Sequence, residues 1–160
     1  MRVVRPISGE SLKPGHVYVA PPGQHLRISN LGKCVLGTED HENYCRPSAD
    51  VLFRSAVRRF GSRTLGVVLT GFLDDGARGA AGIRAAGGVV IAQDPATCYA
   101  AQMPNAAIKA GADFILSPAE ISSALASLVM TPGVAAMFGV GPYRRVAEHG
   151  DRPETPPVAA

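Results

Sequence analysis

The chain has 160 residues, 46% of them hydrophobic and 18% charged, which suits one globular domain with a core of its own. A net charge of +3, with no aromatic residues among the clustered Arg54, Arg58 and Arg59, gives no support for nucleic-acid binding. No hydrophobic run could cross a bilayer, and MRVVRPISGE lacks the apolar stretch of a signal peptide, so we expect a cytoplasmic protein without membrane insertion.

The first third of the chain predicts short strands and turns. Hydrophobic and polar residues alternate in HVYVA (16–20) and HLRIS (25–29), and KCVLG (33–37) is a candidate for a further short strand. Pro21-Pro22-Gly23 is typical of a turn. We expect a β-hairpin or a small meander here, not part of a parallel core.

A helix is predicted over RPSADVLFRSAVRRFG (46–61). Ser48 is suited to cap its N-terminus and Gly61 to end it. The apolar residues recur at helical spacing and should form one buried stripe: Ala49, Leu52, Phe53, Ala56, Val57 and Phe60.

From residue 64 onward strands and helices alternate. Apolar strands are predicted in 64–70, 87–93 and 113–117, and helices over 77–86, over 103–111 and from residue 118. Ser117 and Glu120 form a capping box around Pro118, and Ile121, Leu125, Leu128 and Val129 should be the buried stripe of the last helix. This order predicts a three-layer α/β domain over residues 1–130 with a mostly parallel, doubly wound sheet, followed by a flexible tail over 131–160.

Acidic residues follow two of these strands, at the sheet edge where ligands of such folds gather. Asp74-Asp75 follows the strand at 64–70, and Gln93-Asp94 follows the strand at 87–93. Asp75 could cap a helix or orient a histidine in a hydrolase triad, whereas Asp94 before Pro95 favours a turn or cap. The spacing of Gly71, Gly76, Gly79 and Gly82 loosely resembles a phosphate loop, but two carboxylates there would repel the ligand.

Other chemistry has little support in the sequence. Cys34, His41 and Cys45 have neither a C-x-x-C pair nor a fourth ligand nearby, so we expect no metal site and no cofactor. No serine lies in a G-x-S-x-G elbow, and Ser48 is explained as a helix cap. A complete Ser-His-Asp triad within this chain is therefore not expected.

Several long motifs, in this order, resemble the catalytic domain of the chemotaxis protein-glutamate methylesterases (CheB type). They are VYVAPPGQHLRI, RPSADVLFRSA, GVVLTGFLDDGARG, AGGVVIAQDPATCYAAQMPNAAI and GADFILSP. The resemblance extends from Pro6 to about Leu128. It implies a mostly parallel sheet between helices with a hairpin, and hydrolysis of glutamate methyl esters, with glutamine deamidation in many members, on chemoreceptors.

The resemblance also assigns roles to residues. The family's acid precedes the glycine of the LTG…DG segment, which makes Asp75 the carboxylate that orients the catalytic histidine. Phe72-Leu73 replaces the family's usual Met-Gly, so Phe72 would be a bulkier wall of the substrate pocket. Cys45 stands where a histidine usually precedes Arg-Pro-Ser.

The family's serine and histidine belong to segments that precede the match, so residues 1–130 resemble an N-terminally incomplete methylesterase domain. We expect this chain alone to lack appreciable esterase activity. We also expect an open edge on the strand at 64–70, and hence oligomerisation or a need for a complementing chain. The alternative is a non-catalytic module that binds receptor or a catalytic partner.

Overall fold

The computed structural model describes residues 1–130, as seven strands, four α-helices and two 3-10 turns. The elements in chain order are β1 (Arg2–Val4), β2 (His16–Tyr18), β3 (His25–Ile28), β4 (Cys34–Gly37), α1 (Ala49–Phe60), a 3-10 turn (Gly61–Arg63), β5 (Leu65–Val68), α2 (Ala77–Ala85), β6 (Val89–Gln93), a second 3-10 turn (Pro95–Thr97), α3 (Gln102–Lys109), β7 (Phe114–Leu116) and α4 (Pro118–Met130).

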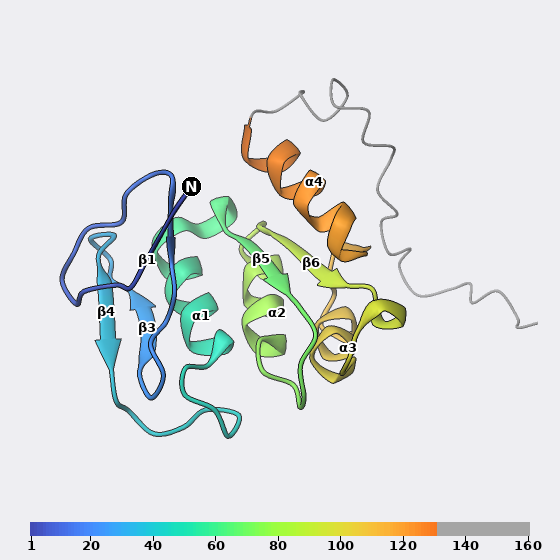
Figure 1. Ribbon diagram of the computed structural model, residues 1–160, viewed down its shortest axis with the longest axis horizontal. Coiled ribbons are helices and arrows are strands. Elements are labelled where there is room, and N and C mark those ends of the chain that lie inside the picture. The colour runs from blue at the N-terminus through green and yellow to red at the C-terminus, as the bar shows by residue number, and fades with distance from the viewer. Residues whose placement is uncertain (131–160) are drawn as a thin grey trace, which may run out of the picture.

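A parallel sheet with the order β5-β6-β7 forms the centre of the α/β part (Figure 1). On one face, Val68 and Val90 pack with Ala80 and Ile83 of α2 and Ala107 of α3. On the other face, residues of α4 cover the sheet: Ile121 and Ala124 pack with Ile91 and Leu116. The predicted α/β architecture, with a parallel sheet between helical layers, is therefore confirmed.

The N-terminal third contains one feature that the sequence analysis missed. An antiparallel hairpin is present, but it joins β3 to β4, with Arg27 opposite Val35; the hairpin predicted between HVYVA and HLRIS, across the turn at residues 21–23, is wrong. β2, however, pairs in parallel with β1, where no strand was predicted, instead of extending a meander. The reason is that β1 and β2 have three residues each and no buried apolar face, since Val3 and Val17 are both exposed. Alternation of side chains could not reveal such a pair.

Helix α1 links the hairpin to the α/β part, since it packs against β3 and against α2 (Figure 1). It begins after Ser48 and ends before Gly61 as predicted, and Gly61 has a positive φ of 56°. The Ser48 side chain, however, makes no capping hydrogen bond to the helix, because its hydroxyl donates to Asp75. The apolar stripe of α1 is only half-buried, with Phe53 and Val57 packed on the main core. The fully enclosed side chains of α1 are polar instead: Asp50 and Ser55.

The remaining helices also lie close to their predicted ranges. The capping box of α4 is present, because Ser117 Oγ donates to Glu120 Oε2 over 2.6 Å and the Ser117 amide donates to the same carboxylate. Ile121 is buried as expected, whereas the side chains of Leu128 and Val129 and the predicted tail at 131–160 lie outside the described residues. Within residues 1–130, no helix is long and apolar enough to cross a membrane.

Candidate functional site

Asp75 lies at the carboxyl end of β5, in the loop that leads into α2. The loop turns sharply, since Leu73 has a φ of 62° and Gly76 has a φ of 92°. A left-handed backbone is costly for a leucine and free for a glycine, so Leu73 occupies a position suited to glycine. The turn exposes Phe72, Leu73 and Asp74 but directs Asp75 inward, leaving it 8% exposed.

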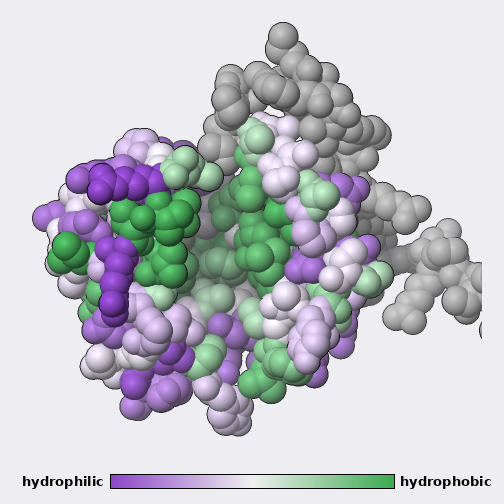
Figure 2. All heavy atoms as spheres, viewed as in Figure 1, coloured by the Kyte–Doolittle hydropathy of each residue, from purple (hydrophilic) through white to green (hydrophobic). Residues whose placement is uncertain are grey.

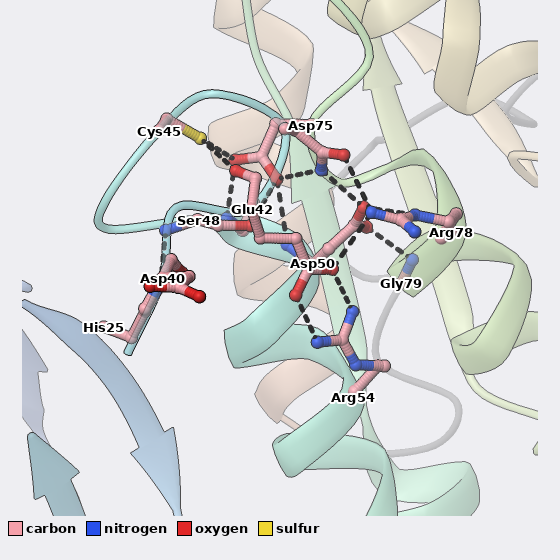
Figure 3. A network of polar contacts seen from close by, with 12 residues as sticks. His25, Asp40, Glu42, Cys45, Ser48, Asp50, Arg54, Asp75, Arg78 and Gly79 are labelled. Atoms are coloured by element: carbon pink, nitrogen blue, oxygen red, sulfur yellow. Dashed lines mark hydrogen bonds and ion pairs between the residues drawn. The ribbon is translucent and has the colours of Figure 1, made fainter. Parts of the chain in front are cut away.

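The Asp75 carboxylate accepts hydrogen bonds from five groups, all of them on the segment 43–50 (Figure 3). Oδ1 accepts from Asn43 Nδ2 at 2.9 Å, Ser48 Oγ at 2.6 Å and the Asp50 amide at 3.2 Å. Oδ2 accepts from the Ala49 amide at 2.6 Å and the Cys45 thiol at 3.3 Å. Two of the donors are main-chain amides at the N-terminus of α1, so Asp75 caps a helix other than the one it precedes.

A second buried carboxylate completes a reciprocal arrangement. Asp50, in the first turn of α1, accepts from the Gly79 amide of α2 at 2.6 Å. Asn43 Nδ2 joins the two acids, since it donates to Asp50 Oδ2 at 2.8 Å as well as to Asp75. Arg78 Nε contacts Asp50 Oδ2 at 3.3 Å from the solvent side. Helix α1 therefore supplies an acid to the N-terminus of α2, and the loop before α2 supplies an acid to the N-terminus of α1, where the helix dipole favours negative charge.

These contacts shift the acid–base properties of the site. Burial acts to raise the pKa of Asp75, but the hydrogen bonds from Ser48, Ala49 and Asn43 outweigh it and leave the pKa below its ordinary value. Burial, and then the hydrogen bond and charge of Asp75, raise the pKa of the Cys45 thiol to about 11. At neutral pH the site thus holds a carboxylate and a protonated thiol.

A serine lies beside Asp75 and a histidine lies beside that serine, but the three are not in a catalytic arrangement. The Ser48 hydroxyl donates to Asp75, and the Ser48 amide, not the hydroxyl, donates to Nδ1 of His25 at 3.2 Å. Nε2 of His25 lies 3.0 Å from the carbonyl oxygen of Asp40. His25 and Ser48 are 1% and 3% exposed, so the imidazole can neither deprotonate the hydroxyl nor meet a substrate.

The other predicted site residues lie at the same end of the sheet. Phe72 is 64% exposed and meets the exposed Tyr99 edge to face, with ring centroids 6.4 Å apart. Gln93 holds the loop ends together, accepting from the Thr70 amide and donating to Thr97. Asp94 caps the 3-10 turn that follows it, as its position before Pro95 predicts.

None of the five partners of Asp75 was singled out as such from the sequence: Asn43, Cys45, Ser48, Ala49 and Asp50. Asn43 and Tyr44 have positive φ values, of 52° and 62°, in a loop that offers no periodicity to interpret. The signal that could have found Asp50 is its place on the helix face predicted to pack inward, next to Ala49 and Phe53. Among the described residues no cluster of histidine, cysteine or acidic side chains could hold a metal ion.

Comparisons with known proteins identify the family and the fold. The family model described as CheB methylesterase matches residues 1–125. The crystal structure of the Thermotoga maritima CheB methylesterase catalytic domain superposes with a TM-score of 0.75 at 36% identity, covering 78% of this chain and 68% of that one.

Two curated relatives show how similar the chain is to full-length members and how much of their length it matches. A protein-glutamate methylesterase/protein-glutamine glutaminase of Rhodopseudomonas palustris is 45% identical over 108 residues, which is 66% of this chain and 28% of the relative. One from Geobacter metallireducens is 43% identical over 125 residues, 77% of this chain and 36% of the relative. The chain thus spans about a third of the length of these relatives, and it belongs to the CheB methylesterase family.

Proposed function

We propose that this chain carries the orienting carboxylate and part of the substrate wall of a cytoplasmic protein-glutamate methylesterase that acts on chemoreceptors. In this proposal Asp75 holds the catalytic histidine in one tautomer and stabilises the imidazolium that forms during ester hydrolysis. Phe72 is the wall against which the methylated glutamate side chain lies. The names of the relatives extend the reaction to glutamine deamidation.

The observation that supports this proposal is that one of the five hydrogen-bond donors to Asp75 is much weaker than the others. Four of the five are strong N–H or O–H donors, and the fifth is the Cys45 thiol at 3.3 Å. A thiol is a weak donor, so an imidazole N–H could take its place on Oδ2 without disturbing the cap of α1. The lowered pKa of Asp75 keeps the carboxylate ionised, as an orienting acid must be.

We propose further that the chain does not hydrolyse esters unaided. Ser48 and His25 are both buried, and the Ser48 hydroxyl does not hydrogen-bond the His25 imidazole. An orienting acid without nucleophile and base leaves only residual acceleration. The test is release of methanol from methylated receptor, with the T. maritima catalytic domain as positive control, and we expect no turnover above buffer. Turnover at the rate of that control would overturn this proposal.

A receptor-binding role without catalysis is the second candidate, favoured by the exposed side chains of Phe72, Leu73 and Tyr99 at one end of the sheet. We expect receptor to cosediment with the chain, and Phe72→Ala to weaken binding by about tenfold, the loss typical of an aromatic anchor. Leu31→Ala, at an exposed leucine in the β3–β4 turn, is the matched control and should bind normally. Equal binding by the two variants would exclude Phe72 from the contact.

A further inference from the structure

We propose that Tyr44 is a binding residue for the receptor segment that carries the methylated glutamate, and that its ring contacts the residues flanking this glutamate. The inference rests on the proposed function. It adds to the same site a second aromatic contact, from a loop other than the one that contains Phe72.

Tyr44 lies at the tip of a two-residue hairpin turn. The Glu42 amide donates to the Cys45 carbonyl at 3.2 Å, and the Cys45 amide donates to the Glu42 carbonyl at 3.0 Å. Between them, Asn43 and Tyr44 have φ values of 52° and 62°, as in a type I′ turn. Asparagine is common at the first of these positions, but glycine is the residue that fits the second without cost. Tyr44 therefore occupies a position at which a tyrosine strains the backbone.

The strained positions of the described chain are concentrated at this site. Within residues 1–130 three non-glycine residues have a positive φ, and all lie in the two loops that meet at Asp75: Asn43, Tyr44 and Leu73. Figure 1 shows the segment between β4 and α1 and the loop between β5 and α2 reaching the same, lower edge of the view. The Cys45 thiol, next to Tyr44, lies 3.3 Å from Asp75 Oδ2. Strain of this kind clusters at functional sites, where it persists because the surroundings hold it.

The neighbours of Tyr44 fix the turn in place. Asn43 Nδ2 donates to both buried acids of the site, and the Glu42 carboxylate is paired with Arg54 and Arg78 (Figure 3). The turn is thus held by contacts on the residues before and after its tip. An aromatic side chain on such a support loses little conformational freedom when it binds, which favours affinity.

The Tyr44 ring has no visible role in the fold itself. It is 90% exposed, and no hydrogen bond or ring contact joins it to another residue of the described chain. It is the only phenylalanine, tyrosine or tryptophan in 38–46, and Figure 2 shows mainly hydrophilic side chains over this segment, at the lower left. A tyrosine that strains the backbone and packs against nothing in the fold suits contact with a partner, since tyrosine is enriched among the anchor residues of binding sites.

The place of the turn identifies the occupant. Tyr44 is adjacent in the chain to Cys45, which contacts the carboxylate that the proposed function sets beside the reacting ester. A glutamate that presents its ester there brings the neighbouring residues of its own chain, at roughly 3.5 Å per residue if extended. The polypeptide on either side of the glutamate is therefore the ligand within reach of the Tyr44 ring.

The substitution Tyr44→Gly separates the ring from the backbone. Glycine adopts the left-handed conformation freely, so the variant should unfold at a higher urea concentration than the unsubstituted chain. It should nevertheless bind methylated receptor about tenfold more weakly in cosedimentation, whereas Tyr44→Phe, which keeps the ring, should bind nearly as tightly. Leu31→Ala, at an exposed leucine in the β3–β4 turn, is the control and should bind normally. Unchanged binding by Tyr44→Gly, or a lower urea midpoint, would overturn the proposal.

Hydroxyl-radical footprinting of the full 160-residue chain gives a second readout without any substitution. Bound methylated receptor should suppress oxidation of Tyr44. Oxidation of Tyr18 should not change, because this tyrosine belongs to β2 and its hydroxyl accepts from the Lys13 amide, away from the site. Equal oxidation of Tyr44 with and without bound receptor would contradict the contact.

These outcomes distinguish the inference from the proposed function on which it rests. Receptor that binds the chain and leaves Tyr44 unprotected would refute the contact and leave the roles of Asp75 and Phe72 intact. Receptor that binds the T. maritima catalytic domain but neither this chain nor its variants would contradict the receptor as partner, and both proposals would then fail.

Discussion

At the scale of single residues, Asp75 has a structural role that does not depend on its proposed catalytic role. Its carboxylate connects the N-terminus of α1 to the segment 43–48 through five hydrogen bonds. A carboxylate can accept all of these because it has lone pairs on both oxygens and no hydrogen. An orienting acid must be held still, and the same donors that lower the pKa of Asp75 hold it.

Replacing this acid tests the cap. Asp75→Asn turns one oxygen into an NH2 group that faces donors such as the Ala49 amide, leaving buried groups without partners. We expect a loss of about 3 kcal/mol in the free energy of unfolding, measured by urea denaturation. Asp74→Asn, at the exposed neighbouring acid, is the matched control and should change stability by less than about 0.5 kcal/mol. Equal effects would show that the network adds nothing to stability.

The lowered pKa of Asp75 gives this effect a pH dependence of known sign. Because the folded pKa lies below the unfolded value of about 3.9, the contribution is complete above that pH and is lost as pH falls through the folded pKa. The stability difference between the chain and Asp75→Asn should therefore shrink on acidification below about pH 4. Urea titrations at neutral and acidic pH measure it, and a constant difference would contradict the assignment.

At the scale of elements, two glycines of α2 should respond oppositely to the same substitution. A Cβ at Gly79 would lie 2.5 Å from Phe53 Cβ of α1, whereas one at Gly82 meets nothing within 4 Å. Gly79→Ala should force α1 and α2 apart and cost about 2 kcal/mol. Gly82→Ala should stabilise α2 by about 0.5–1 kcal/mol. Thermal unfolding of both variants measures the contrast, and a stable Gly79→Ala protein would mean that the helices pack less closely.

The elements found from the sequence are those whose side chains repeat with a period. β5, β6 and β7 are continuous apolar runs, and α1 has a stripe at helical spacing, so their existence and order could be predicted. β1 could not be predicted, since three half-exposed or exposed residues carry no pattern. Nor could its parallel pairing with β2, because strand partners far apart in the chain leave no trace in local alternation.

The candidate site was predictable only in part, for a related reason. Asp75 stands out because it follows an apolar strand, and its family motif assigns it a role that stays a prediction. Its partners lie 25 to 32 residues earlier, in the loop before α1 and in the first turn of α1, and their contacts depend on how α1 packs against α2. The reciprocal exchange of Asp50 and Asp75 between two helix N-termini is a tertiary feature, so no local rule reveals it.

At the scale of the whole molecule, residues 1–130 contain two parallel sheets, and only one of them is covered by helices. The β5–β7 sheet has helices on both faces and encloses Ile91 and Val90 completely. The β1–β2 pair exposes Val3, Val17 and Val19, and parallel sheets of two short strands are rarely stable without cover on both faces. The two sheets should therefore open at different free energies.

Native-state hydrogen exchange in low urea measures this difference. The Val19 amide, bonded to the Val4 carbonyl at 3.0 Å, should exchange by local opening, with a rate almost independent of urea. The Ile91 amide should exchange only through global unfolding and accelerate steeply with urea. Equal urea dependence at both amides would contradict this expectation, since it would make β1–β2 part of one cooperative unit with β5–β7.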